Sequence, residues 1–348
     1  MTSTTDSGTI PATALDHMRE TMAARDAAQA ERIVAAGQAV VERFEAERLK
    51  IVPAELQKRL RAHAAEHRLA EDADLEARLR RSARQRAYMA EIGVDLVALD
   101  RMRADFAEQA GAVAALPGMG DAEVSIVPGE GRALEEGDAS LVAYDGNWDP
   151  GPAWGSSRPG DFAVWNQESF WAPTINRAGS HIRFRQRETG DNSWAWMSWR
   201  NGYMRLFTLP AARPLVVDVD VTCEHSRFFI DTDDEPGGSG CRVELSQSVQ
   251  VEVYSNWADS VPQETVSGLL ASTGTTSTEN WQDFEAVPAW SKRKVRVNSQ
   301  KTYAGGQQVA VFASIMNFAN GARLNDTRLT AGVDAAWIID NITVRPVF

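Results

Sequence analysis

The sequence predicts an α+β protein of two domains, in which an N-terminal long-helix bundle or coiled-coil stalk precedes a C-terminal antiparallel β-sandwich. Three observations predict this. The N-terminal third is built from good helix formers, and Pro53 is the only proline between Pro11 and Pro117. Beyond it lie short β-rich segments separated by polar turns. Seven of the eleven tryptophans fall between Trp148 and Trp199, and none comes earlier. We therefore expect a flexible tail over 1–11, helices over 12–116, a linker over 117–140 and a sandwich over 141–348.

Composition narrows the classes of partner. The chain has 348 residues, 43% hydrophobic residues and a net charge of −12, which suits a globular protein and disfavours nucleic acid as a partner. No stretch reaches the ~20 apolar residues of a membrane-spanning helix. The N-terminus has no basic start and no apolar core. We therefore expect synthesis in the cytoplasm without a signal peptide, with release or export by a non-classical route left open.

Helices are expected on both sides of Pro53. Before it, apolar residues follow steps of three and four, which form one stripe along a helix: Ile33, Gly37, Val40, Phe44 and Ile51. Proline breaks this helix, and Leu56 starts a second one. A third begins at Leu75, capped by Asp72 or Asp74. Its stripe is expected to continue unbroken through the following residues: Met89, Ile92, Leu96, Leu99, Phe106 and Val113.

The narrow stripe must be buried against another helix. An intrachain bundle and an oligomeric coiled coil, which would make the protein a homo-oligomer, remain equal alternatives. Arg25, Gln29 and Arg86 fall near positions where a regular seam would place apolar residues. The heptad pattern is therefore imperfect.

Strands are expected in the second half at seven segments: Ile182–Arg185, Leu215–Val221, Arg227–Ile230, Val249–Tyr254, Lys294–Val297, Gln308–Ser314 and Trp337–Val344. Many short strands with polar turns indicate a sandwich. The two cysteines, Cys223 and Cys241, fit reduced thiols better than a disulfide, although a single bridge remains open.

The last segment, W-I-I-D-N-I-T-V from Trp337 to Val344, resembles the closing strand of carbohydrate-binding-module jelly rolls. The resemblance implies a sandwich of jelly-roll type. It also implies that Asp340 helps to hold a structural calcium ion. It does not identify ligand-facing aromatic residues.

The tryptophan cluster is the leading candidate for ligand contact, because flat aromatic faces suit sugar rings. Trp194 and Trp196 share one face of a strand and Trp199 the other, and most of these residues are expected in the core. Trp148 and Trp154 lie among Gly and Pro and are the better candidates, with Asn147 and Asp149 beside them. Other nearby polar residues are Asn166, Arg183 and Asn192.

The segment D-T-D-D-E is the second candidate, as a calcium site formed by Asp231, Asp233 and Asp234. A solvated acidic turn is the alternative, since the spacing is not that of an EF-hand. His63, Glu66 and His67 match the H-x-x-E-H zinc pattern, but no third ligand is evident. No catalytic residues are predicted.

These patterns favour a non-enzymatic recognition protein whose sandwich binds a glycan or a protein receptor, with the helices as spacer or oligomeriser. A component of a phage, injection particle or toxin complex would have this architecture. A pore-forming toxin with membrane-active helices and a glycan hydrolase or lyase are the alternatives.

Overall fold

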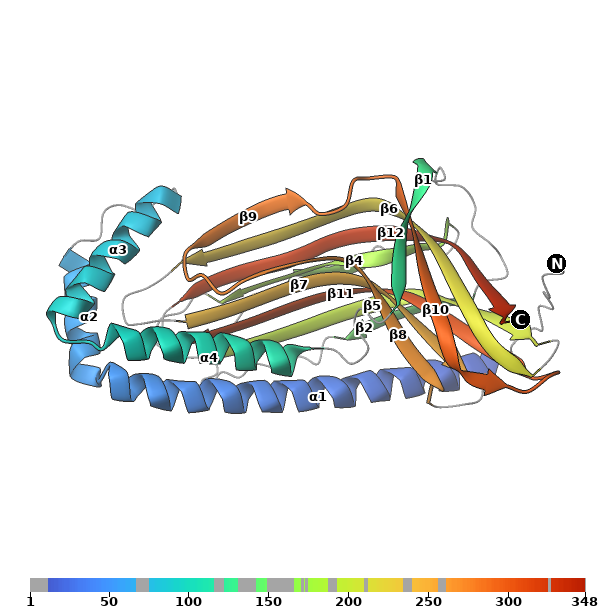
Figure 1. Cartoon of the computed structure of the whole chain (residues 1–348), viewed down its shortest axis with the longest axis horizontal. Helices are drawn as coiled ribbons and strands as arrows, with labels where there is room; N and C mark the ends of the chain where they lie inside the picture. The colour runs from blue at the N-terminus through green and yellow to red at the C-terminus, as the bar shows by residue number, and fades with distance from the viewer. Residues whose placement is uncertain are drawn as a thin grey trace.

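The computed structural model describes residues 12–66, 75–115, 122–130, 142–148, 166–169, 172, 175–186, 193–209, 212–233, 240–255, 261–324 and 327–347. Figure 1 shows the arrangement, in which a long helix runs beside two stacked sheets. The expected tail over 1–11 lies outside the described residues. The fold is an antiparallel β-sandwich with a helical N-terminal region.

The helices follow the sequence pattern with one difference. They are α1 (Ala12–Ile51), α2 (Ala54–Glu66), α3 (Leu75–Glu91) and α4 (Leu96–Ala114). Pro53 separates α1 from α2, as predicted. The expected cap residues Asp72 and Asp74 lie outside the described residues.

One continuous helix was expected from Leu75 to Val113, and this expectation is wrong, although the apolar stripe itself continues. The chain turns between α3 and α4 at Gly93, whose φ of 88° suits glycine. Gly93 N–H donates to Ala90 O and Val94 N–H to Met89 O, which is the Schellman arrangement that ends a helix. Asp95 then caps α4 by accepting a hydrogen bond from the Ala98 N–H at 2.9 Å.

Two antiparallel sheets form the sandwich. The five-stranded sheet has the order β2-β5-β11-β7-β8, and the seven-stranded sheet the order β1-β10-β6-β12-β4-β3, with β9 added beside β6. The bounds are β1 (Glu123–Glu130), β2 (Val142–Trp148), β3 (Asn166–Ser169), β4 (Arg177–Gln186), β5 (Ser193–Thr208), β6 (Arg213–Asp233), β7 (Gly240–Tyr254), β8 (Glu264–Thr275), β9 (Asn280–Glu285), β10 (Ser291–Tyr303), β11 (Gln308–Leu324) and β12 (Arg328–Pro346).

All seven predicted strand segments lie within strands, but the strands are longer than expected. Leu215–Val221 and Arg227–Ile230 belong to one strand, β6. β6 pairs with β12 along nearly its whole length, with bulges at Ala336/Trp337 and Ile339/Asn341. The segment 117–140, expected to be a linker, contains β1, which pairs with β10. The sandwich therefore begins before residue 141.

The helices α1 and α4 cover the outer face of the five-stranded sheet. α1 packs against α4, β5, β2 and β11, and α4 packs against β7. Phe44 and Phe106 meet edge to face at 5.6 Å and share a hydrophobic cluster with Trp194, Trp196 and Phe318 of the sheet. The apolar stripe is therefore buried within the chain, partly against helix and partly against sheet. A coiled coil between chains remains a prediction.

Charged positions in the stripe also have partners. Arg25 reaches Glu252 of β7, and Arg86 of α3 binds Asp100 of α4. Two of the residues that make the heptads imperfect, Arg25 and Arg86, thus connect the helices to the sheet and to each other.

Between the two sheets lies the main core, formed by side chains that alternate along each strand. Neither cysteine forms a disulfide and both are buried, so the expectation of reduced thiols is confirmed. Burial raises the pKa of the Cys223 thiol to about 12. No helix within the described residues is long and apolar enough to cross a membrane.

Candidate functional site on the open face of the seven-stranded sheet

The outer face of the seven-stranded sheet carries exposed aromatic and charged side chains. On β4, Ile182 and Phe184 point into the core, so Arg183 points outward. On β6, Phe228 and Ile230 point inward and Phe229 outward for the same reason. Since α1 and α4 cover the other sheet, we call this outer surface over β4, β12, β6 and β9 the open face. α3 contacts it at the end of β6.

An aromatic row crosses the open face. Phe229 of β6 meets Trp281 of β9 edge to face, with ring centroids 5.2 Å apart. The Arg183 guanidinium lies over the Phe229 ring at 4.6 Å. Trp281 is 50% exposed. The row offers an aromatic surface with a cationic donor beside it.

Gly332 of β12 makes this row possible. It pairs with Arg183 on one side and with Phe229 on the other, so no side chain stands between them. A Cβ at Gly332 would lie 2.8 Å from the Ile182 carbonyl oxygen and 3.2 Å from the Arg183 Cβ. A larger residue here would crowd β4 and separate arginine from ring.

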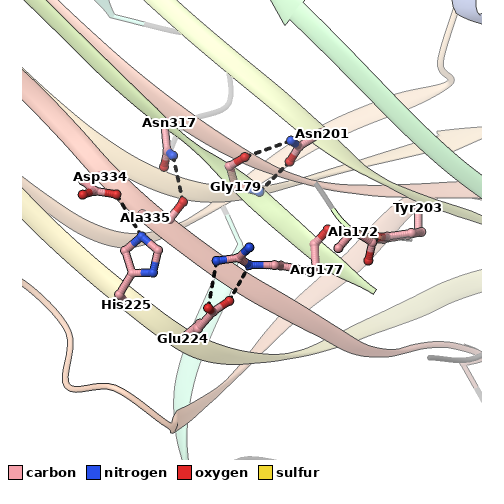
Figure 2. A network of polar contacts seen from close by, with 10 residues as sticks. All are labelled: Ala172, Arg177, Gly179, Asn201, Tyr203, Glu224, His225, Asn317, Asp334 and Ala335. Atoms are coloured by element: carbon pink, nitrogen blue, oxygen red, sulfur yellow. Dashed lines mark hydrogen bonds and ion pairs between the residues drawn. The ribbon is translucent and has the colours of Figure 1, made fainter. Parts of the chain in front are cut away.

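A charged row lies beside the aromatic one. Asp334 of β12 is 2.8 Å from His225 Nε2 (Figure 2). It is also 3.7 Å from His181 Nδ1. Burial would raise the pKa of Asp334, but the hydrogen bonds and charges of His181 and His225 outweigh it and hold this pKa below its usual range. Arg227 donates two hydrogen bonds to Asp283, at 2.6 and 2.7 Å.

A further ion pair borders these rows. Arg177 of β4 donates to both carboxylate oxygens of Glu224 on β6, at 2.5 and 2.8 Å (Figure 2). The two strands lie on either side of β12, so this pair spans the middle strand. The paired charges keep donors and acceptors in fixed positions along the open face.

Buried amides hold the strands beneath the open face. Asn201 of β5 accepts from the Gly179 N–H at 2.6 Å and donates to the Gly179 carbonyl at 2.9 Å. Asn317 of β11 donates to the carbonyls of Ser180 and Ala335, at 2.8 and 3.3 Å. Figure 2 shows these amides reaching across from the five-stranded sheet. They fix the backbones of β4 and β12.

The chemistry of the open face suits binding. Aromatic rings, guanidinium groups and carboxylates recognise a ligand through stacking and directional hydrogen bonds. Among the described residues, no group of three His, Cys, Asp or Glu side chains is arranged to hold a metal ion.

The predicted residues Asn147 and Trp148 lie elsewhere. They belong to β2 of the five-stranded sheet, where they pair with Trp199 and Ser198 of β5. Asp149 and Trp154 lie outside the described residues. Their role in ligand contact remains a prediction.

The predicted acidic turn contacts a helix. Asp231 accepts from Arg78 of α3 at 2.6 Å, and Asp233 forms an ion pair with Arg81 of α3. Asp234 lies outside the described residues. These two carboxylates therefore dock α3 onto the end of β6, and calcium binding there remains a prediction.

The other predicted calcium ligand, Asp340, accepts from Thr222 Oγ1 at 2.6 Å. It lies ten positions along β12 from Thr330, the residue that pairs with Asp231. At about 3.3 Å per residue, roughly 30 Å separate Asp340 from the acidic turn. One ion cannot bind both.

The tryptophan alternation is confirmed. Trp194 and Trp196 pack under the helices, while Trp199 lies between the sheets, and all three are buried. His63 of the zinc-like pattern stacks on Tyr88 at 3.9 Å, and His67 lies outside the described residues.

Sequence reasoning noted Arg183 but missed Phe229, Trp281 and Asp334. These residues come from strands that are far apart in the chain. Only the outward alternation of each strand could have suggested them, and alternation does not reveal which strands are neighbours.

No family model and no curated protein sequence matches this chain. Among solved structures it is similar to TmCBM61 in complex with β-1,4-galactotriose, with 11% identity, a TM-score of 0.16, and coverage of 54% of this chain and 92% of that one. It is also similar to the enzymatically active domain of bacteriophage CBA120 tailspike protein 4, with 6% identity, a TM-score of 0.17, and coverage of 56% of this chain and 19% of that one. A third similar structure is TmCBM27, a mannan-recognising carbohydrate-binding module, with 12% identity, a TM-score of 0.13, and coverage of 56% of this chain and 97% of that one. TM-scores this low establish no shared fold.

Proposed function

We propose that this protein is a non-enzymatic recognition protein that binds a glycan on the open face of its seven-stranded sheet. The observation that carries the proposal is the row of Trp281, Phe229 and Arg183, an exposed aromatic surface flanked by a fixed cation. Sugar rings combine apolar C–H faces with hydroxyls that both donate and accept. The aromatic row suits the C–H faces, and the Arg227–Asp283 pair beside it suits the hydroxyls.

In this proposal the helices position the sandwich within a larger particle, such as a phage, an injection particle or a toxin complex. Leu75 and Leu79, exposed one turn apart on α3, are the side chains through which we propose that the helices attach. Release from the cell by a non-classical route is part of the same proposal.

A glycan array probed with the full-length chain tests the function, with and without calcium. Trp281→Ala should keep the melting temperature within a few degrees, since the side chain is half exposed, and should weaken glycan binding at least tenfold. Trp290→Ala is the matched control, because Trp290 is 39% exposed outside the aromatic row and should leave binding unchanged.

The proposal fails if the array shows no glycan binding, or if folded Trp281→Ala binds as tightly as the parent chain. Release of reducing sugar from a bound glycan would instead favour the hydrolase, with His225 and Asp334 as its first candidates for acid–base chemistry.

A further inference from the structure

We propose that a second ligand site lies on the opposite sheet, in a pocket between the end of α4 and strands β7 and β8, and that it takes one or two saccharide units. The site is independent of the open face. It goes beyond the proposed function because it predicts binding of a short, free sugar away from the aromatic row.

The pocket has a volume of about 600 Å³, within the usual size range of small-ligand sites. It exists because α4 ends at Ala114, so the outer surface of β7 and β8 beyond that point is not covered by α4. Ser272 of β8 and Thr276, which follows β8, bring hydroxyl groups to a wall that is otherwise mainly apolar.

The ion pair of Arg242 and Glu244 identifies the ligand class. Arg242 donates to Glu244 through Nε at 3.1 Å and through Nη2, and both bonds use the same carboxylate oxygen, Oε1. Among the described residues neither Arg242 Nη1 nor Glu244 Oε2 makes a further hydrogen bond. A donor and an acceptor thus remain side by side, which matches a sugar hydroxyl or a vicinal pair of hydroxyls.

The opposite charges of the pair disfavour simple ions and apolar ligands. An anion would meet Glu244 and a cation would meet Arg242, each at an electrostatic cost in a partly buried wall. A purely apolar ligand would remove both charged groups from water without replacing their hydrogen bonds. A neutral, hydroxylated ligand satisfies both, and Phe318 and Leu269 offer apolar contact to its C–H groups.

Small residues leave space for the pair. A Cβ on Gly111 of α4 would lie 3.1 Å from Arg242 Nη2 and 3.3 Å from Glu244 Oε1. Ala114 and Ala115 continue this bare helix edge along the pocket. The helix therefore supports the ion pair without side chains that would fill the cavity.

Isothermal titration of the full-length chain tests the site with four neutral disaccharides: lactose, cellobiose, maltose and mannobiose. We expect at least one to bind with a dissociation constant of about 1 mM or tighter. Ser272→Trp should abolish binding by filling the pocket, and Glu244→Gln should weaken it at least tenfold by removing the charged acceptor. Asn298→Trp, exposed on β10 of the other sheet, is the matched control and should bind normally.

Trp281→Ala separates this site from the open face. Disaccharide binding that survives Trp281→Ala and is lost in folded Ser272→Trp supports the second site. Binding that is lost in Trp281→Ala and kept in Ser272→Trp overturns it, as does a parent chain that binds none of the four probes. Each variant is checked by its melting curve first.

Discussion

At the scale of single residues, Asp334 has an unusual setting for a side chain on an outer sheet surface. Two histidines from neighbouring strands share its carboxylate, and both are placed by strand pairing with β12. The sequence could not have predicted the cluster, because His181, His225 and Asp334 meet only through the order of the strands. By contrast, burial of Trp194 and Trp196 on one face followed directly from period-two alternation.

The carboxylate of Asp334 should stabilise the fold in a pH-dependent way. Its pKa is lowered in the folded state, so its stabilising effect is present above the unfolded value near 3.8 and is lost as pH falls through the folded pKa. Asp334→Asn should therefore lower the melting temperature at pH 6, and the difference from the parent chain should shrink below about pH 4.

Melting curves from pH 2 to 7 measure this difference. Asp105→Asn, at an exposed position of α4, is the control and should show no such trend. A melting-temperature difference for Asp334→Asn that does not change with pH would mean that the histidine contacts do not act electrostatically.

At the scale of elements, the helices and strands were largely predictable, and their ends and joins were less so. Pro53 ends α1 because its ring clashes with the preceding helical turn, and a proline is visible in the sequence itself. α3 ends at Gly93, and Asp95 then caps α4. This signal in the sequence is weaker than a proline, and the continuous apolar stripe argued against a break there. The apolar stripe itself continues because both α3 and α4 contribute to the same hydrophobic cluster.

Gly93→Ala should destabilise the chain by about 1 kcal/mol, because alanine in the left-handed region meets its own backbone. The effect is purely conformational, since nothing lies within 4 Å of a Cβ at this position. Chemical denaturation measures it. Gly93→Asn should cost less, as asparagine tolerates this region better, and equal losses for the two variants would contradict the conformational explanation.

The contact between α1 and the five-stranded sheet depends on Glu252. Its carboxylate accepts from Arg25 of α1 at 2.5 Å, from Arg200 of β5 at 3.0 Å and from Tyr254 at 2.6 Å, and it is fully buried. Burial would raise its pKa, but the charges of Arg200 and Arg25 outweigh this and lower it.

Glu252→Gln should cost about 3–5 kcal/mol of unfolding free energy, because it leaves Arg200 buried without its counter-charge. Denaturant unfolding measures the loss. Glu47→Gln, in an exposed pair with Arg43, should cost less than about 1 kcal/mol. Similar losses for both variants would show that the buried network contributes no more than a surface pair.

At the scale of the molecule, the structure has three layers, one of helices and two of sheet, whereas the sequence suggested a helical unit followed by a β unit. Composition changes sharply between the helical and β regions, and that change predicted both kinds of structure correctly. It could not show that the helices lie along a sheet, because an apolar stripe fits a helix partner and a sheet partner equally well. The open face follows from this arrangement, since α1 and α4 pack on the five-stranded sheet and not on the outer face of the other.

Removing the helices should expose Trp194, Trp196 and Phe318 to water. We expect residues 122–348 alone to self-associate, to bind a hydrophobic dye and to melt well below the full chain. Sedimentation and dye fluorescence measure these effects. A monomeric fragment with the melting temperature of the full chain would show that the two regions are stable independently.

The amides beneath the open face have a consequence for how this protein can change over evolution. Asn317 and Asn201 bind main-chain atoms of β4 and β12 and, at Ser180, one buried hydroxyl, so they do not depend on which side chains those strands display outward. A shift of one sheet against the other by a single residue would break these bonds inside a dry core. Outward residues of the same strands other than Gly332 can therefore be exchanged without moving the backbone that presents them. The outward side chains set the specificity and the buried amides set the architecture. A new ligand therefore requires changes only in the outward side chains.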